Sequence, residues 1–566
     1  MKIKSELSNI IQNALDRANI TTDEVVISDA TKPEFGDYQY NGVMKLAKSL
    51  RRNPREIATE LVEQIDTSTL IQKVEVAGPG FINIWLDNAW LAQQTNQIIQ
   101  DPRVGVGHLP RTQRVVVDYS GPNMAKQMHV GHLRSSIIGD TLATLLEFLG
   151  DEVIRQNHIG DWGTQFGMLI AYLEEQQTDG NTQELKDLEQ FYKDAKVRFD
   201  QDDNFANKAR EYVVKIQSGD PHCLRLWQSF IDASLRHCEE VYEKLGVNLT
   251  RDDVRAESFY NDQLSNIVQT LQDQEIATHS NGAVCVFLEG DENPVIIQKS
   301  DGGFLYATTD LAALAYRDKV LKADRICYVV DARQAQHFKQ VFSIAKRSGL
   351  VRPEVKLEHI GFGTMMDKSG KPFKTRDGGT VKLVDLLDEA VARAKATIKD
   401  RDLHSQEELE RVAKAIGIGA VKYADLSISR ESNYIFSWEK MLSFEGNTAL
   451  YMQYAYARIQ SIFRKYDKEL TGEIIIGDEL EHRLGVMILK FEDTLIKASI
   501  DATPHTITGY LYDLVTLFMK FYEQNPILKE GVDEATQQSR LRLAQLTGNV
   551  IQKGLEILGI EVVDRI

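Results

Sequence analysis

Hydrophobic and polar residues divide the chain into stretches of different periodicity. In the first stretch, helical spacing at residues 4–18 and 41–65 alternates with strand-like runs. One run, KVEVAGPGFINIWL, places a Gly-Pro-Gly turn between two β-rich segments, which predicts a hairpin. We therefore expect a separate N-terminal α+β domain at residues 1–110, ending in the linker DPRVGVGHLPRTQR.

The middle of the chain has a strand–helix–strand pattern. RVVVD is followed by a turn-rich loop, a helix beginning near His132 and a second strand in DEVIRQ. This order predicts a doubly wound, Rossmann-type sheet at residues 111–380, with ligands beyond the carboxyl ends of its strands. The charged, helical residues after Tyr172 predict a helical insertion at about 172–290. We expect the later strand patterns to join the same sheet; they are GAVCVFL, PVIIQK, RICYVVD and LEHIGFGTMM.

The last third shows only helical periodicity, as in ALYMQYAYARIQSIFRKY and GYLYDLVTLFMKFYEQ. We expect a connecting helical segment at residues 381–440 and an all-helical domain at 441–566. The predicted fold class is therefore multidomain α/β. A Rossmann-type domain with a helical insertion lies between an N-terminal α+β domain and an all-α C-terminal domain.

Composition narrows the class of protein. A chain of 566 residues is too long for one core, and its 43% hydrophobic and 26% charged residues are typical of a folded globular protein. No apolar run reaches membrane-spanning length and the N-terminus has no signal-like apolar core, so we expect a cytoplasmic protein with no membrane partner. The net charge of −17 argues against non-specific coating of nucleic acid, so any RNA partner must meet local basic patches.

The four cysteines, at positions 223, 238, 285 and 327, include no C-x-x-C pair. This spacing favours neither a disulfide framework nor a cysteine zinc site. We expect buried free thiols and no protein-bound metal.

His129-Val130-Gly131-His132 stands where the pattern places a strand–loop–helix turn. When ATP is attacked at its α-phosphate, charge builds on the phosphates. Imidazoles at a helix N-terminus can donate hydrogen bonds to that charge, alongside the helix dipole. Gly131 would let a nucleotide lie close to the backbone. The alternative is a pair of ordinary surface histidines.

The segment KSGKPFKTRDG, residues 368–378, follows the strand-like HIGFGTMM. Its three lysines and one arginine suit transient contact with a departing pyrophosphate. A solvated basic turn is the alternative for such a segment taken alone. Paired with the histidine motif, it gives the chain two candidate phosphate-binding segments.

These two motifs resemble the H-I-G-H and K-M-S-K-S signatures of the class I aminoacyl-tRNA synthetases. The similarity is closer to the arginine-specific branch, whose VDYSxPNxAKxxHVGHLRS pattern matches residues 117–135. Further similar blocks lie at 157–165, 305–313, 444–448 and 451–458. The resemblance covers essentially the whole chain and implies that the N-terminal domain binds the tRNA elbow and the C-terminal domain binds the anticodon.

The resemblance also implies a reaction and its partners. An arginine–tRNA ligase would use ATP to convert L-arginine to arginyl-adenylate, then transfer it to the 3′ end of tRNA(Arg), releasing AMP and pyrophosphate. ATP would arrive with Mg²⁺ as a substrate complex, and no tightly bound cofactor is implied. A monomer is usual in the family.

A planar guanidinium requires carboxylate and phenol or amide oxygens in one pocket. Tyr306 and Asp310 are four residues apart and share a face if this stretch is helical. The resemblance implies that both bind the arginine side chain, that Gln334 lines the pocket, and that Asp118 and Asn123 hold the α-amino end. The alternative is a helix-capping Asp310 and a core Tyr306.

For ATP and catalysis, the resemblance implies roles for the two motifs and one further lysine. The lysine motif is degenerate here, and Lys126, just before the histidine motif, is thought to compensate in such enzymes. The implied ATP-binding residues are His129, Gly131, His132, Lys374 and Thr375. The implied catalytic residues are Lys126, His129, His132, Lys371 and Lys374.

For RNA contact, the resemblance implies that Phe81 and Asn83 lie near the D-loop, where an exposed aromatic ring and an amide could stack on and read an unpaired base. A Phe81 buried in a hairpin is the alternative. Tyr451, Tyr454 and Arg458 repeat at helical spacing and could stack on anticodon bases, although a tyrosine stripe also fits core packing. The chain ends in isoleucine where many family members end in methionine, which leaves a hydrophobic anticodon contact there open.

Three other functions share part of this pattern. A cysteinyl or glutamyl class I synthetase would need a different amino-acid pocket, and the cysteinyl type a zinc site that the cysteine spacing does not support. A nucleotidylyltransferase acting on a small molecule would not need the N-terminal and C-terminal domains. A non-catalytic tRNA-binding paralogue would be expected to have lost His129, His132, Asp310 or Lys374, and all four are present.

Overall fold

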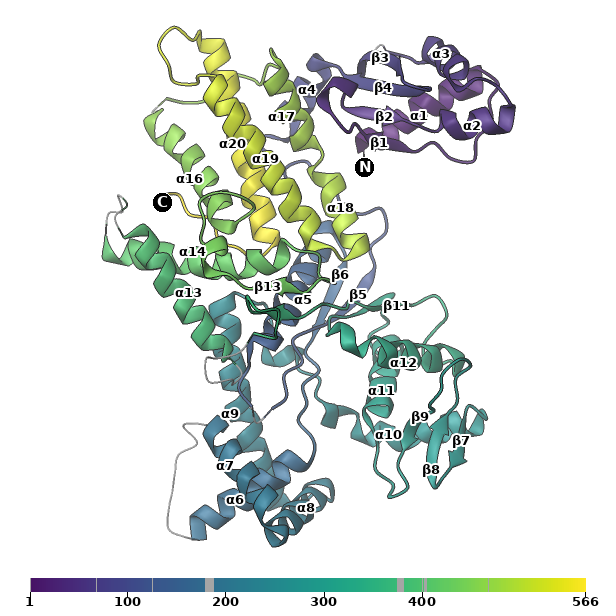
Figure 1. The fold of residues 1–566 in the computed structure, drawn as a ribbon, viewed down its shortest axis with the longest axis vertical. Coiled ribbons are helices and arrows are strands. Elements are labelled where there is room, and N and C mark those ends of the chain that lie inside the picture. Colours follow the sequence, from purple (N-terminus) through teal and green to yellow (C-terminus); the bar gives the residue numbers. More distant parts are fainter. Residues whose placement is uncertain are drawn as a thin grey trace.

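The structure, a computed structural model, describes most of the chain, and Figure 1 shows its parts. An N-terminal α/β unit lies beside a long helical bundle formed by the C-terminal third. The central α/β region lies below the bundle, and two further groups of elements extend from it. The described residues are 2–67, 69–124, 126–178, 188–373, 381–399, 401, 405–466 and 468–566.

The described part of the N-terminal unit is a four-stranded antiparallel sheet, in the order β1-β2-β4-β3, with helices packed against it. The predicted hairpin is β3–β4. The expected helix at 41–65 is instead two helices, because Arg51 adopts the left-handed conformation and Asn53 caps a new helix before Pro54. The elements are β1 (Ile27–Asp29), β2 (Tyr38–Tyr40), β3 (Ile71–Ala77), β4 (Phe81–Leu86), α1 (Lys2–Arg17), α2 (Val43–Leu50), α3 (Pro54–Gln64) and α4 (Asn88–Ile98).

The central domain contains a parallel sheet in the order β11-β10-β5-β6. The chain passes from β5 to β6 on one side and returns to β10 on the other, so the switch point lies between the ends of β5 and β10. The sheet and its helices are β5 (Arg114–Asp118), β6 (Glu152–Gln156), β10 (Arg325–Tyr328), β11 (Lys356–His359), α5 (Val130–Leu149), α11 (Tyr306–Lys319) and α12 (Ala335–Arg347).

GAVCVFL and PVIIQK do not join this sheet, contrary to the sequence prediction. With the preceding strand β7 (Ala277–Ser280), they form a separate antiparallel sheet, as β8 (Ala283–Val286) and β9 (Val295–Gln298). The reason is the Asn281-Gly282 turn, in which both residues have positive φ and which joins neighbouring strands antiparallel. Residues 277–280 and 283–286 are therefore strands, although the expected helical insertion ran to about residue 290.

Before these strands, the insertion is helical as predicted. Its helices lie below the parallel sheet in Figure 1, apart from α10, which packs with α11. They are α6 (Thr164–Thr178), α7 (Leu188–Gln201), α8 (Asp203–Gln217), α9 (Pro221–Leu245) and α10 (Asn261–Asp273), and short 3₁₀ turns are η1 (Pro33–Phe35), η2 (Arg251–Asp253), η3 (Glu257–Tyr260) and η4 (Ala332–Gln334).

In the described part of the chain after residue 380, the regular elements are helices and one short strand. That strand, β13 (Tyr434–Ile435), pairs with β12 (Met365–Met366) and joins the start of the lysine segment to the helical region. The prediction of helix alone after residue 400 missed it, since two residues carry no periodicity. The helices are α13 (Leu383–Ile398), α14 (Gln406–Leu426), α15 (Trp438–Met441), α16 (Ala449–Lys465), α17 (Glu479–Leu489), α18 (Phe491–Asp501), α19 (Pro504–Gln524) and α20 (Glu534–Ile557).

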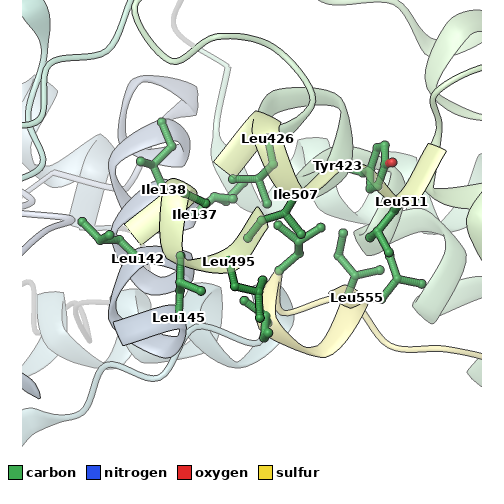
Figure 2. Packing of buried hydrophobic residues seen from close by; sticks show 14 of the residues in the cluster. Ile137, Ile138, Leu142, Leu145, Tyr423, Leu426, Leu495, Ile507, Leu511 and Leu555 are labelled. Carbon is green, nitrogen blue, oxygen red and sulfur yellow. The ribbon is translucent and has the colours of Figure 1, made fainter. Parts of the chain in front are cut away.

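Helix α5 belongs to two layers at once. Residues 133–143 are all buried, because α5 lies between the parallel sheet and the C-terminal bundle. Figure 2 shows Ile137 and Leu145 of α5 near Leu426 of α14, Leu495 of α18 and Ile507 of α19. One continuous core therefore fixes the helix that begins at the histidine motif.

The four cysteines are buried and unpaired, as predicted. Burial raises the pKa of Cys238 and of Cys327 to about 12. In the described part of the chain, no helix has the length and apolar character needed to cross a membrane.

Candidate active site at the carboxyl edge of the parallel sheet

A cavity of about 670 Å³ opens at the switch point between β5 and β10. Its walls come from the segments that follow the parallel strands and from the first turns of α5 and α11. This is where an open parallel sheet binds its ligand. The cavity brings together eight residues selected from the sequence: Asp118, Asn123, His129, Gly131, His132, Tyr306, Asp310 and Gln334.

The two histidines cap α5. The backbone N–H of Gly131 donates to Nδ1 of His129 at 3.0 Å, and the backbone N–H of His129 donates to Nδ1 of His132 at 3.1 Å. Because each Nδ1 accepts a hydrogen bond, the proton of each neutral ring sits on Nε2. Burial lowers the pKa of both rings, that of His132 to about 3. Two neutral Nε2–H donors thus stand at the positive end of a 20-residue helix, unlike ordinary surface histidines.

Gly131 has a local steric role. A Cβ atom there would lie 2.7 Å from Cε1 of the His129 ring, closer than real Cβ contacts allow. Glycine therefore leaves space for the ring to fold over the helix N-terminus, in addition to any room it leaves for a nucleotide.

The stretch containing Tyr306 and Asp310 is helical, as the pairing of the two residues required. Tyr306 is the first residue of α11 and is 72% exposed, so it is not a core residue. Asp310 does not cap the helix; its Oδ2 lies 2.6 Å from Nε2 of His337. Both side chains belong to the cavity wall, where a phenol and a carboxylate can meet one ligand.

Glu257 is a cavity residue that sequence reasoning missed. It lies in η3 and lines the cavity with Asp310. Burial, and then the charges of Asp161 and Asp310, raise its pKa to about 7. A site that crowds carboxylates in this way favours a cationic ligand. The segment containing Glu257 has neither a motif nor a periodicity that would mark it in the sequence.

Asp118 ends β5 and is almost fully buried. Its Oδ2 accepts a hydrogen bond from Nη2 of Arg317 at 2.7 Å, and its Oδ1 accepts one from the backbone N–H of His158 at 3.3 Å. Asn123 forms a parallel bridge with Gly160 nearby. These contacts fix the two residues in the cavity wall.

The described lysines selected from the sequence, Lys126 and Lys371, lie outside the cavity wall. Lys371 is exposed, in a turn held by Oδ1 of Asp367, which accepts its backbone N–H at 3.1 Å. Nζ of Lys126 lies 5.0 Å from the centre of the Tyr192 ring, and neither lysine lines the cavity. Phe373 of the same segment does line it. Lys374 and Thr375 lie outside the described residues.

The two residues expected at the tRNA elbow differ in exposure. Phe81 is half-buried at the start of β4, and Asn83 is only 2% exposed. Gln39 stands opposite Asn83 on β2, and its Nε2 donates to Oδ1 of Asn83 at 2.7 Å. The amide of Asn83 is therefore not exposed as expected, because it is buried and hydrogen-bonded to its cross-strand partner.

A second cavity, of about 1040 Å³, lies in the C-terminal bundle. The guanidinium of Arg458 stands 5.9 Å from the ring of Tyr454 and 4.9 Å from that of Tyr522. Tyr451 packs against Tyr512 instead and does not line this cavity. Basic residues dominate the wall, which also includes Glu523 and Ile566: Arg401, Arg458, Arg464, Lys465, Lys529 and Arg565. The six basic side chains make this wall a local concentration of positive charge on a chain whose net charge is −17.

The switch-point sheet and the histidine-capped helix are the features of a class I aminoacyl-tRNA synthetase, and the family model "tRNA synthetases class I (R), catalytic domain" matches residues 94–438. Models of the "Arginyl tRNA synthetase N terminal domain" and the "DALR anticodon binding domain" match residues 3–86 and 452–566. The chain belongs to the arginyl-tRNA synthetase family.

Curated relatives agree over the full length. The arginine–tRNA ligases of Cellvibrio japonicus and Alteromonas mediterranea are 53% and 51% identical, with 100% of each chain covered. Among solved structures, the arginyl-tRNA synthetase of Plasmodium falciparum is 29% identical with a TM-score of 0.86, covering 100% of this chain and 99% of that one. That of Thermus thermophilus, 23% identical with a TM-score of 0.80 over 100% of both chains, shares the fold. The family resemblance and the fold class predicted from the sequence are confirmed.

Proposed function

We propose that the cavity at the carboxyl edge of the sheet is the site at which this chain carries out the reaction of its family. The chain is an arginine–tRNA ligase, which activates L-arginine with ATP and charges tRNA with it. One observation supports the assignment most strongly. Two neutral imidazole donors and an acidic wall containing Asp310 and Glu257 line the same cavity.

In the first step, a carboxylate oxygen of arginine forms a bond to the α-phosphorus of ATP. The bond from that phosphorus to the bridging oxygen breaks, and pyrophosphate leaves with the electron pair. We assign His129 and His132 to hydrogen bonding with the phosphate oxygens, through Nε2–H, as charge grows on them. In the second step, a hydroxyl of the terminal tRNA adenosine attacks the arginyl carbonyl and AMP leaves.

The arginine side chain would lie between Tyr306, Asp310 and Glu257, with Gln334 on the same wall. Asp118 and Asn123 would hold the α-amino end. A lysine substrate would present one ammonium point charge instead of a planar fork of donors, leaving wall oxygens without hydrogen bonds. Selection for arginine therefore follows from unsatisfied acceptors as well as from size.

We assign Lys371, Lys374 and Thr375 to the phosphates and to departing pyrophosphate, with Lys126 supporting the degenerate lysine motif. Lys126 and Lys371 lie outside the cavity, so both roles require the nucleotide complex to draw these side chains inward. Mg²⁺ would enter with ATP. Among the described residues, no group of three or more histidine, cysteine, aspartate or glutamate side chains is placed to hold a metal ion.

For the tRNA, we propose that residues 441–566 bind the anticodon at the basic cavity, with Tyr454 and Arg458 as the stacking pair. Ile566 at the rim would offer the apolar contact. Residues 1–110 would bind the tRNA elbow. Phe81 is the better candidate for contact with the RNA, since Asn83 would first have to break its hydrogen bond with Gln39. Tyr451 would act through packing, and residues 381–440 would connect this domain to the catalytic domain, residues 111–380.

The test is arginine-dependent exchange of pyrophosphate with ATP, measured with and without a tRNA fraction. Lysine, cysteine and glutamate serve as control amino acids, and Asp310→Asn as the matched variant. Exchange that occurs with arginine but with none of the three control amino acids, and that is lost in the variant, supports the assignment. Exchange with another amino acid, or full exchange in Asp310→Asn, contradicts it. We further propose that the protein is cytoplasmic and monomeric. Light scattering at assay concentration measures the molar mass and so tests the monomer.

A further inference from the structure

Arg317 is a buried cation that the mechanism above does not use. It lies on α11, seven residues after Asp310 and therefore on nearly the same face of the helix, about 10 Å further along its axis. Its side chain is 0% exposed. It does not line the cavity, but its guanidinium lies 4.7 Å from the ring of Tyr328, which does.

The guanidinium of Arg317 connects three elements. Nη2 donates to Oδ2 of Asp118, at the end of β5, at 2.7 Å. Nε donates to Oε1 of Gln156, at the end of β6, at 2.7 Å. One side chain thus links the helix bearing Tyr306 and Asp310 to the strand end bearing Asp118. These are the two parts of the cavity wall that the proposed function assigns to the guanidinium and the α-amino group of arginine.

We propose that Arg317 is a positioning residue that sets the distance between these two subsites, and hence the length of amino-acid side chain that the site accepts. This inference rests on the proposed function. Apolar contacts such as those of Leu311 and Leu314 bury α11 without fixing its axial position, since hydrophobic burial is non-directional. Two hydrogen bonds from one rigid guanidinium do fix it.

A small axial shift of α11 is enough to change the spacing between the two subsites. Sliding α11 by the rise of one residue, about 1.5 Å, changes the subsite spacing by roughly the length of one methylene. A pocket alone discriminates one methylene by only about 10–200-fold. Fixed spacing between two charged subsites therefore matters for selection by length.

The test compares charging with arginine and with homoarginine, which is one methylene longer. Arg317→Lys keeps a cation beside Asp118 but lacks a second nitrogen for Gln156. We expect kcat/KM for arginine to fall on the order of 10- to 100-fold, and the preference for arginine over homoarginine to fall about 10-fold. KM for ATP should stay within about twofold of wild type, as expected for a change confined to the amino-acid site. Gln156→Met removes one of the two anchors and should shift the preference in the same direction, by less.

Arg352→Lys is the matched control. Nε of Arg352 donates to Oδ1 of Asp318 at 2.6 Å, so it pairs with the next residue of α11 but touches neither β5 nor β6. We expect its preference between the two amino acids to equal that of wild type. Melting temperature and circular dichroism of every variant report folding, and Gln156→Met decides the question if Arg317→Lys does not fold.

Equal losses for arginine and homoarginine in Arg317→Lys, or a parallel rise in KM for ATP, would overturn the inference. So would an unchanged preference in Gln156→Met. Failure of the proposed function is distinguishable. If Asp310→Asn still charges arginine selectively, the site assignment is wrong. If Asp310→Asn abolishes charging while Arg317→Lys leaves the preference unchanged, only the role of Arg317 is wrong.

Discussion

Glu257 gives a prediction in which stability and activity move in opposite directions. Its carboxyl lies near other acids in the cavity proposed to bind arginine, and burial with the charges of Asp161 and Asp310 raises its pKa from 4.5 to about 7. Glu257→Gln replaces it with a neutral side chain of the same shape. Without arginine the variant should be more stable than wild type, and with arginine it should be less active.

The magnitude follows from the pKa. Below pH 4.5 the carboxyl is protonated in both the folded and the unfolded chain, so it contributes no difference in stability. Between pH 4.5 and 7 the unfolded chain ionises first, and the cost to the folded state grows. Above pH 7 the cost is complete, at up to about 3 kcal/mol, since one pKa unit corresponds to about 1.4 kcal/mol.

The assay is the melting temperature of both proteins at pH 5, 7 and 8.5, with and without arginine. The advantage of Glu257→Gln should be small at pH 5 and reach several degrees at pH 8.5. Arginine should cancel it, because the guanidinium stabilises the ionised carboxyl of the wild type. In the same pH series, kcat/KM for arginine should rise through pH 7 and level off above it in wild type, and stay flat in the variant. Melting curves that differ equally at every pH would refute this reasoning.

Three further predictions test the assigned sites. Asp310→Asn should lower kcat/KM for arginine on the order of 10²- to 10³-fold by leaving the guanidinium short of a charged partner, with an unchanged melting temperature as the control. His132→Ala should lower kcat by about 10²-fold while KM for ATP changes little, whereas equal loss in both would make the ring a ground-state binder. Because the pKa of His132 is about 3, its contribution to kcat should be constant from pH 6 to 9. Arg458→Ala should raise KM for tRNA on the order of 10-fold and leave KM for arginine unchanged, because it removes one member of the proposed stacking pair; an unchanged KM for tRNA would remove Arg458 from the tRNA contacts.

Local patterns predicted the elements that form the site. The three valines of RVVVD are consecutive because β5 is buried on both faces, and the histidine motif follows it at the turn where α5 begins. Tyr306 and Asp310 could be paired because helical spacing brings them together once the stretch is helical. In each case the information lies within a few residues of the chain.

Contacts between distant segments could not be predicted in the same way. Glu257 reaches the cavity through the fold of the insertion. Gln39 hydrogen-bonds Asn83 because β2 pairs with β4, and the sequence alone does not give the register of that pairing. The Asn281-Gly282 turn did carry a local hairpin signal. The prediction of one large sheet nevertheless assigned the strands beside it to the parallel sheet, whereas β7 and β8 pair with each other. The protonated nitrogen of each histidine likewise depends on backbone donors that only the folded turn supplies.

The burial of all four cysteines has a practical consequence. Exposed thiolates attack thiol-reactive dyes, and burial keeps Cys238 and Cys327 protonated and out of reach. Cysteines introduced at the exposed positions Met44 of the N-terminal unit and Val320, just after α11, would therefore take up label against a quiet background. A donor and an acceptor dye at those two positions would let single-molecule fluorescence follow the distance between the N-terminal unit and the catalytic region while tRNA is bound and released.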